Sequence, residues 1–357
     1  MTRVYAVLLV VAACSFDSAG QGGSGAVQGS SDTSAATSIG ATSVSETTVS
    51  ETTVSSGLAT DAHPSTTAAD GSSGAATDTT SAADSGGESG DVPPELGPFA
   101  PPQLAGSLAT EFYEDDPTLT SDMLEIYFAS LRPGSQGGEN IWRATRASVG
   151  VPFDPPAPVE VLNGPATEGW PELSLDGLTL TFGSDRNGFE QFDVFIVERD
   201  TIDDEFGSPA LAVDLSTPAP ETSAVFSASM LEVFLCSPVG SGADLQRATR
   251  LALGDDFGAS APLLSVNSSD RDCTPFVDPS GTRILFSSTR AGSLGDYDIW
   301  TALRAGDGDT FEEATNVDGL NSEVEDGDPW WAPDGSAIWF ASMRGNDDLD
   351  IYYALQR

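Results

Sequence analysis

The sequence predicts an all-β protein, a five-bladed β-propeller preceded by a long polar segment. Three observations support this prediction. One pattern recurs five times at intervals of 52 to 54 residues. Each copy contains short segments with the composition of β-strands, and the first and last copies complement each other. A fixed period of this size is typical of repeat architectures, and four antiparallel strands per unit define a propeller blade.

The repeat is anchored on the pattern Phe-x-Ser at the end of its second strand. The anchors are Phe128, Phe182, Phe234, Phe286 and Phe340, spaced 54, 52, 52 and 54 residues apart. A tight turn precedes the anchored strand, as at Asp-Gly 176–177 and 334–335, where Gly tolerates the backbone angles of a hairpin turn. The strand itself alternates, as in LTLTFGS and AIWFAS.

Two further strands follow each anchor. The third strands are NIWRATR, DVFIVER, DLQRATR, DIWTALR and DIYYALQ, and the fourth are the short stretches PVEVLN, PALAVDL, APLLSV and FEEATNV. The last copy lacks a fourth strand, whereas PPQLA at 101–105 stands alone before the first copy. We therefore expect this segment to complete the last blade and cover its open edge. A six-bladed ring is the alternative, but the polar segment offers no strands for it.

The predicted units are approximately 114–166, 168–219, 220–271, 272–325 and 326–357, the last completed by 98–106, within a propeller spanning 98–357. Residues 14–97 are rich in Ser, Thr, Gly and Ala and bury too little apolar surface to offset chain entropy. We interpret them as a disordered tether. The only His of the chain, His63, lies in this segment.

Residues 1–13, MTRVYAVLLVVAA, combine one Arg with an apolar run too short to span a membrane, which predicts a signal peptide. The run ends Val11-Ala12-Ala13-Cys14, which resembles the lipobox of bacterial lipoproteins. The resemblance implies cleavage before Cys14, a lipid on that residue and anchoring to a membrane. Ser15 then implies the outer membrane. An ordinary signal peptide with an incidental Cys is the alternative.

The composition narrows the classes of partner. The chain has 55 acidic and 14 basic residues, a net charge of −41, and every basic residue is Arg. Such an excess repels nucleic acids and anionic lipid surfaces, so no nucleic-acid partner and no membrane contact beyond the anchor are expected. Cations and positively charged partners remain compatible with it.

The turn APDG at 332–335, the strand pattern Phe-x-Ser-x-Arg and the following Asp-Ile-Trp/Tyr strand resemble the WD40-like β-propeller repeats of TolB and its relatives, over residues 98–357. The third copy departs from the pattern, with Met230 for the turn Gly and Pro238 for the Arg. The departure puts in doubt any function that needs five equivalent positions. The resemblance implies a periplasmic or surface interaction module that is not an enzyme. We expect the chain to be a monomer and to bind an envelope or extracellular protein.

Charged residues also follow the repeat. Arg recurs after the second strand and again after the third, and acids recur before and within the innermost strand, so that acids and the first Arg set share one rim. The first Arg set is Arg132, Arg186, Arg290 and Arg344, the second is Arg146, Arg199, Arg250 and Arg304, and the candidate acids are Glu114, Asp116, Glu168, Asp272, Asp326 and Asp328. One interpretation is structural pairing of Arg with carboxylates. The other is a negative channel that binds a cation.

Ca²⁺ takes oxygen ligands, and the Asp-rich loops at 296–298 and 346–350 could supply them. Their spacing does not match an EF-hand loop, so no cofactor is predicted beyond this Ca²⁺ alternative. Enzyme activity is not predicted either, because the propeller contains no His for a catalytic triad or a zinc site. A glycoside hydrolase that uses paired acids of the channel, or a glycan-binding lectin that uses Trp170 and Trp330, remains the alternative.

Cys236 and Cys273 are the cysteines left after Cys14. Both map to the same rim of neighbouring blades, in a compartment that permits oxidation. We therefore predict a disulfide between the third and fourth blades. The loops RPGSQGGEN, DRNGFEQFD and RAGSLGDYD at this rim are the expected binding surface, since binding residues often lie on loops held by a rigid scaffold.

Overall fold

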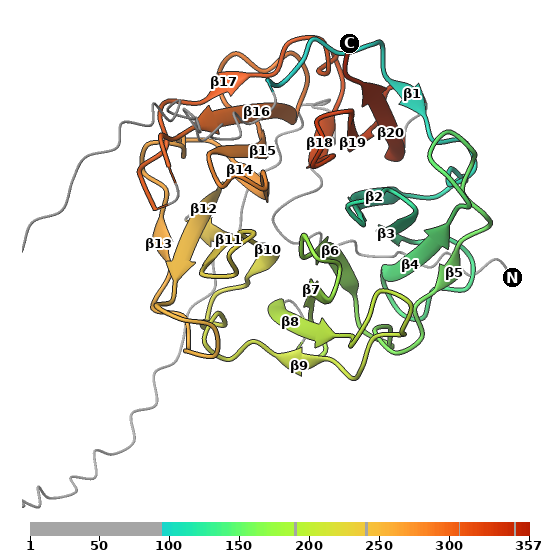
Figure 1. The fold of residues 1–357 in the computed structure, drawn as a ribbon, viewed down its shortest axis with the longest axis horizontal. Coiled ribbons are helices and arrows are strands. Elements are labelled where there is room, and N and C mark those ends of the chain that lie inside the picture. Colours follow the sequence, from blue (N-terminus) through green and yellow to red (C-terminus); the bar gives the residue numbers. More distant parts are fainter. Residues whose placement is uncertain (1–94, 189–190, 240–241, 307, 346–347) are drawn as a thin grey trace, which may run out of the picture. The chain divides into compact units, whose positions relative to one another are not determined.

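The computed structural model describes residues 95–357 except 189–190, 240–241, 307 and 346–347. These residues form 20 β-strands and no helix, in five four-stranded antiparallel sheets arranged as a ring (Figure 1). The part of the chain described therefore contains no helix long and apolar enough to cross a membrane. The predicted signal peptide, Cys14, His63 and nearly all of the tether lie outside the described residues.

The strands follow the chain from the centre of the ring outward. The first blade holds β2 (Glu114–Leu119), β3 (Glu125–Ser130), β4 (Asn140–Thr145) and β5 (Ala157–Pro158), and the second holds β6 (Glu168–Leu173), β7 (Thr179–Ser184), β8 (Asp193–Glu198) and β9 (Ala210–Leu211). The third holds β10 (Thr222–Phe226), β11 (Glu232–Val239), β12 (Gly242–Thr249) and β13 (Ala261–Pro262). The fourth holds β14 (Asp272–Val277), β15 (Arg283–Ser288), β16 (Asp298–Leu303) and β17 (Thr315–Asn316).

The fifth blade closes the ring. It consists of β18 (Asp326–Trp331), β19 (Ala337–Ser342), β20 (Asp350–Leu355) and β1 (Gln103–Leu104). Gln103 pairs with Tyr353 and Leu104 with Tyr352, so the segment before the first unit is the outermost strand of the last blade. The predicted five-bladed propeller and its closure are confirmed. Closure of this kind joins both ends of the ring and pairs the exposed edge of β20.

The register of the third blade corrects the sequence alignment. Glu232 pairs with Thr249 as Glu125 pairs with Thr145, so Leu235, not Phe234, occupies the position of Phe128. The anchors are therefore 54, 53, 51 and 54 residues apart. The alignment on Phe was wrong because Leu fills the same buried position, and both Phe234 and Leu235 have no exposed surface.

The corrected register explains where the disulfide lies. Cys236 on β11 occupies the position of Ala129, where small residues face the next blade, and Ser237 keeps the position of the Ser. Cys273 is the second residue of β14 in that next blade. The structure joins the two cysteines, with a Cα–Cα distance of 5.1 Å that suits a disulfide. The bond thus links the third blade covalently to the fourth.

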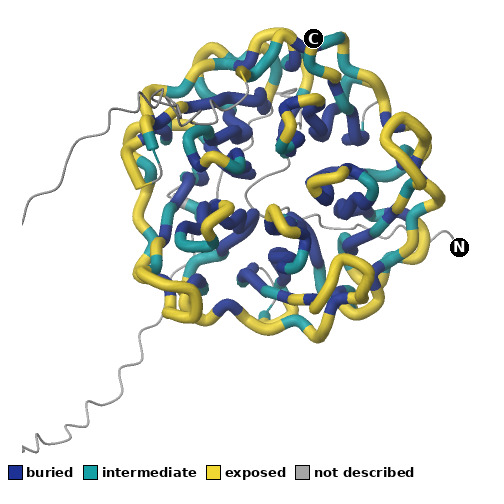
Figure 2. Tube along the Cα trace, in the orientation of Figure 1, coloured by how far each residue is buried: buried dark blue, intermediate teal, exposed yellow. Residues whose placement is uncertain are grey.

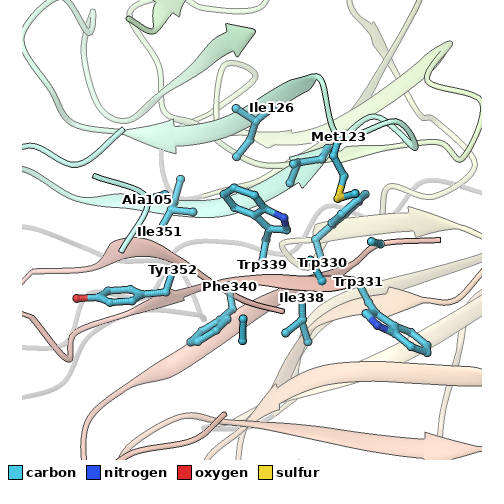
Figure 3. Close-up of a cluster of buried hydrophobic side chains, with 14 of the residues drawn as sticks. Ala105, Met123, Ile126, Trp330, Trp331, Ile338, Trp339, Phe340, Ile351 and Tyr352 are labelled. Atoms are coloured by element: carbon cyan, nitrogen blue, oxygen red, sulfur yellow. The ribbon is translucent and has the colours of Figure 1, made fainter. Parts of the chain in front are cut away.

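Hydrophobic cores lie within the blades and between neighbouring blades, while most exposed residues lie on the connections and the outer edge (Figure 2). The largest cluster joins the fifth blade to the first. Figure 3 shows Trp330, Trp331 and Trp339 of the fifth blade in this cluster with Met123 and Ile126 of the first. Burial of such large rings contributes several kcal/mol to the interface that completes the ring.

Candidate functional site

The first residue of the innermost strand is an acid in most blades, and it is held by a recurring group that we call the clamp. In the first blade, Glu114 receives hydrogen bonds from N and Oγ1 of Thr110 at 2.8 and 2.5 Å and from Ser130 at 3.1 Å. Arg132 forms an ion pair with Glu114 at 3.0 Å and donates to the carbonyl of Leu108 at 2.7 Å. The acid is thus paired with an Arg of its own blade and hydrogen-bonded to the connection that leads into it.

The same clamp recurs in three other blades. Its acid, Ser and Arg are Glu168, Ser184 and Arg186 in the second blade, Asp272, Ser288 and Arg290 in the fourth, and Asp326, Ser342 and Arg344 in the fifth. The third blade has Val239 at the position of the Arg, and no described Arg forms an ion pair with Glu221, the acid of this blade. The recurring Arg therefore has a structural position in the blade.

Burial corrects part of the predicted rim. Glu114, Glu168, Asp272 and Asp326 have no exposed surface, so the clamp leaves none of them for a ligand. The two candidate tryptophans are also enclosed. Trp170 packs edge-on against Phe192 over Gly183, and Trp330 packs against Phe276. The two rings are 6% and 4% exposed, so neither presents the open face that the predicted stacking on sugars requires.

One residue near the start of every innermost strand has an unusual backbone conformation; it is the third residue of β2, β6, β14 and β18 and the second of β10. Its φ lies between 47° and 54°, although none of the five residues is Gly, and a break in pairing with the second strand accompanies it. The five residues are Asp116, Trp170, Ser223, Thr274 and Asp328. A left-handed conformation at a non-Gly residue costs free energy and persists only where the surroundings hold it.

Hydrogen bonds between blades hold these bulges in the first, second and fifth blades. The carboxylate of Asp116 accepts from the backbone N of Trp170 at 3.2 Å, and Asp328 accepts from the backbone N–H of Asp116. The N–H of Asp328 in turn donates to Ser287 at 2.9 Å. Each bulge thus turns a backbone donor toward the preceding blade, and two carboxylates of the predicted rim are brought together near the centre of the ring.

Further acids gather around this pair. We call the set Asp115, Asp116, Glu139, Glu172, Glu325 and Asp328 the acidic cluster; it comes from the first, second and fifth blades. Among the described residues, none of the six forms an ion pair with an Arg, in contrast to the acids of the clamps. Glu139, Glu172, Glu325 and Asp328 are half-buried. The cluster therefore concentrates negative charge where the structure supplies no described cation to neutralise it.

The surroundings make these carboxyl groups hard to ionise. Burial, together with the charge of Asp328, raises the pKa of Glu139 to about 7 and that of Glu325 to about 8. Burial raises the pKa of Asp328 to about 6, although hydrogen bonds from Thr274 and Asp116 oppose the rise. The pKa of Glu172 is raised well above its ordinary value by burial and then by Asp328. Desolvation and like charges both favour the protonated form.

Asp115 is the most enclosed member of the cluster. Asp115 is 5% exposed, and its Oδ1 has no hydrogen-bond partner among the described residues. Burial is the largest cause that raises the pKa of Asp115, and the charges of Glu139, Asp116 and Asp328 add to it, so its carboxyl group lies beside the other acids of the cluster. A buried polar atom without a partner is costly and marks a position where a donor from outside would be favourable.

Sequence reasoning identified Asp116 and Asp328 but missed Glu139, Glu172 and Glu325 as members. A signal was present, because Glu172 departs from the repeat: Thr118, Val225, Phe276 and Trp330 occupy its position in the other blades.

At the turn end of the innermost strands, a cavity of about 30 Å³ has a mainly apolar lining that includes Leu119, Leu173, Phe226, Val277 and Trp330. Among the described residues, no group of three or more His, Cys, Asp or Glu has an arrangement that could hold a metal ion.

The raised pKa values predict that the protein loses stability as the pH rises from 5 to 8.5. Unfolded carboxyl groups release their protons near pH 4, whereas Glu139, Glu325 and Asp328 keep theirs up to pH values between about 6 and 8. The stabilisation is complete below pH 4 and is lost progressively as the pH rises from about 4 to about 8. Allowing for partial exposure, we expect the full-length chain to lose about 2–3 kcal/mol, or roughly 5–10 °C in melting temperature.

Calorimetry at several pH values measures this effect, and Glu139→Gln should flatten the profile by removing one of the titrating groups. A melting temperature that stays constant between pH 5 and 8.5 would show that the carboxyl groups of the cluster do not destabilise the fold when they ionise.

No protein-family model matches the chain, and no curated protein matches it. Solved structures similar to it include TolB from Acinetobacter baumannii, with 16% identity and a TM-score of 0.46 over 70% of this chain and 56% of that one. The putative TolB from Agrobacterium tumefaciens has 17% identity and a TM-score of 0.44 over 71% and 80%. A thermostable family-43 glycoside hydrolase has 12% identity and a TM-score of 0.48 over 71% and 91%. The assignment of the propeller rests on the strand pairing described above.

Proposed function

We propose that the protein is a non-enzymatic binding module of the cell envelope, and that its acidic cluster binds a positively charged segment of a partner protein. One observation carries this proposal: the clamps neutralise the recurring acids, whereas the six acids of the cluster have no ion pair with any described cation. Ammonium or guanidinium groups would supply the missing charge, and the free Oδ1 of Asp115 would accept one of their hydrogen bonds.

A location in the envelope is part of the same proposal. Cleavage before Cys14 and a lipid on that residue would anchor the chain, and the polar segment up to residue 97 would set the distance over which the propeller can reach. The expected observation is a lipid-modified Cys14 in the mass spectrum of the mature N-terminus. A Cys14→Ser variant should then leave the membrane fraction.

Calorimetric titration of the full-length chain with tetralysine tests the binding site. We expect Glu139→Gln/Asp328→Asn to weaken binding at least tenfold, because it removes two carboxylates from the low-dielectric site. Binding should also tighten as the pH rises from 5.5 to 8.5, since the ligand must displace protons from groups whose pKa is raised to about 7 and about 6.

Asp255→Asn/Asp256→Asn is the matched control, because both residues are exposed on an outer loop and the change in net charge is the same. Equal loss of affinity in the two variants would mean that tetralysine senses only the net charge, and the proposed site would be rejected.

A glycoside hydrolase is the second candidate, and the carboxyl groups of Glu139 and Asp328 favour it. A pKa raised to about 7 suits a general acid, and hydrolysis of glycosides requires a pair of carboxyl groups of which one is protonated. Hydrolysis of an aryl glycoside that disappears in Glu139→Gln and persists in Asp255→Asn would replace the binding proposal by this one.

A further inference from the structure

Two of the interfaces between blades contain a buried carboxylate between two Arg residues. At the interface of the first and second blades, Glu125 binds Arg143 of its own blade and Arg199 of the next, the latter at 2.8 Å. Arg199 also stacks on Phe206 at 4.7 Å and donates to the carbonyl of Gly177. The Arg at the end of the third strand thus meets a counterion supplied by the preceding blade.

The interface of the third and fourth blades repeats this arrangement. Glu232 binds Arg247 of its own blade and Arg304 of the next, and Arg304 stacks on Phe311 at 4.6 Å. Arg304 and Arg199 have side chains that are 0% and 1% exposed. Burial of a guanidinium to this extent requires a paired carboxylate, which Glu125 and Glu232 provide.

The interface of the fifth and first blades keeps the Arg but lacks the carboxylate. Ala337 pairs with Leu355 as Glu125 pairs with Thr145, so Ala occupies the position of the Glu. Arg146 still donates to the carbonyl of Met123 at 2.7 Å, and it stacks on Phe153 at 4.4 Å and on Trp339 at 5.5 Å. No described carboxylate lies within ion-pair distance of Arg146.

A cavity of about 530 Å³ lies at this same interface. Arg146 is the only charged residue in its lining, although the chain carries a net charge of −41. Aliphatic side chains that are 41–55% exposed line its open part, namely Leu104, Val149, Val151 and Leu355. The volume is in the range of sites for small molecules, and the combination of one cation with apolar walls defines the ligand that would fit.

The indole N–H of Trp339 is a second observation that supports a ligand in this cavity. It lines the cavity, is 4% exposed, and its indole Nε1 has no hydrogen-bond partner among the described residues. Its ring stacks on Tyr353 at 4.9 Å and is held in the cluster that Figure 3 shows. A buried N–H donor without an acceptor is rare in folded proteins, and an anionic oxygen beside Arg146 would satisfy it.

We propose that this cavity binds a small aliphatic carboxylate, whose charged group takes the place of the missing Glu beside Arg146. The aliphatic chain would lie along Leu104, Val151 and Leu355, and Trp339 Nε1 would donate to a carboxylate oxygen. This site is separate from the acidic cluster and does not depend on the function proposed for it. It is the one interface where an Arg without a carboxylate, a free indole N–H and an apolar cavity are found together among the described residues.

Calorimetric titration of the full-length chain with decanoate, below its micellar concentration, tests the proposal. Decanoate is expected to bind at least tenfold more tightly than decanol, because a charge-assisted hydrogen bond to Arg146 distinguishes them. Arg146→Gln should remove that preference. Ala337→Glu should place a carboxylate beside Arg146, as in the two other interfaces, and should raise the melting temperature while it lowers the affinity for decanoate at least tenfold.

Arg250→Gln is the matched control. Arg250 also donates to a turn carbonyl, that of Met230, and stacks on Phe257, but it belongs to the interface of the second and third blades. Its replacement should leave decanoate binding unchanged. The proposal is overturned if decanol binds as tightly as decanoate, or if Ala337→Glu folds and binds decanoate like the unmodified chain. Because Ala337→Glu stabilises the fold in this scheme, loss of binding in that variant cannot be ascribed to unfolding.

Discussion

Arg132→Ala is expected to lower the free energy of unfolding by about 3–5 kcal/mol, the typical cost of leaving a buried charge without its partner. Its side chain is 7% exposed and that of Glu114 is not exposed at all. The variant also loses the hydrogen bond to the carbonyl of Leu108 and the stacking of the guanidinium on Phe128 and Trp142. Chemical denaturation of the full-length chain measures the loss.

Two further variants separate charge from packing in this prediction. Arg186→Ala removes the equivalent Arg of the second blade, whose side chain is 27% exposed, so water can solvate Glu168 and the loss should be smaller. Arg132→Met/Glu114→Gln removes both charges and should recover part of the stability, because no unpaired ion remains. If Arg132→Ala is no less stable than Arg186→Ala, the clamp does not act through buried charge.

Removal of the disulfide is the second change with a large expected effect. Cys236 and Cys273 are separated by 37 residues, and a closed loop of this length corresponds to about 4 kcal/mol in the chain-entropy estimate. We expect Cys236→Ala/Cys273→Ala to melt roughly 8–15 °C below the unmodified chain. Ala fits the position of Cys236 because Ala129 and Ala341 occupy it in other blades.

A reducing agent provides the control for this prediction. It should lower the melting temperature of the unmodified chain toward that of the double variant and leave the variant unchanged. Cys14 lies far from both positions in the sequence and is present in both proteins. A variant that melts with the unmodified chain under non-reducing conditions would show that the bond contributes nothing to stability.

The third blade, which the disulfide links to the fourth, has an incomplete clamp. Glu221 accepts hydrogen bonds from N and Oγ1 of Thr217 as Glu114 does from Thr110, but Val239 replaces the Arg. The disulfide lies in this blade and the next one, beside Trp170, Phe192 and Ala243. The covalent link therefore involves the one blade in which no ion pair of the clamp is found among the described residues.

The fold was predictable from the sequence because the features that define a blade are local in the chain and recur in each blade. Turn residues, alternating strands and the acid, Ser and Arg of the clamp recur at nearly constant spacing, and these features act within one blade. The one error in the repeat, the choice of Phe234 over Leu235, arose where two apolar residues are adjacent and either can fill the buried position. Strand pairing resolves that ambiguity because a shift by one residue would move every side chain to the other face.

The sites were less predictable, because they depend on contacts between blades. The sequence alone determined the number of blades, the closure of the ring by the segment 101–105 and the two cysteines that can bond, whereas the structure narrowed the closing strand to Gln103–Leu104. Only the tertiary structure decided which acids lie together without an Arg partner and which Arg has no carboxylate partner. Asp115, Glu139 and Asp328, for example, come from separate segments of the chain, two from strands and Glu139 from the loop before β4. Ala337 and Arg146 illustrate the physical reason: they are 191 residues apart in the chain, and only the closed ring places them at one interface.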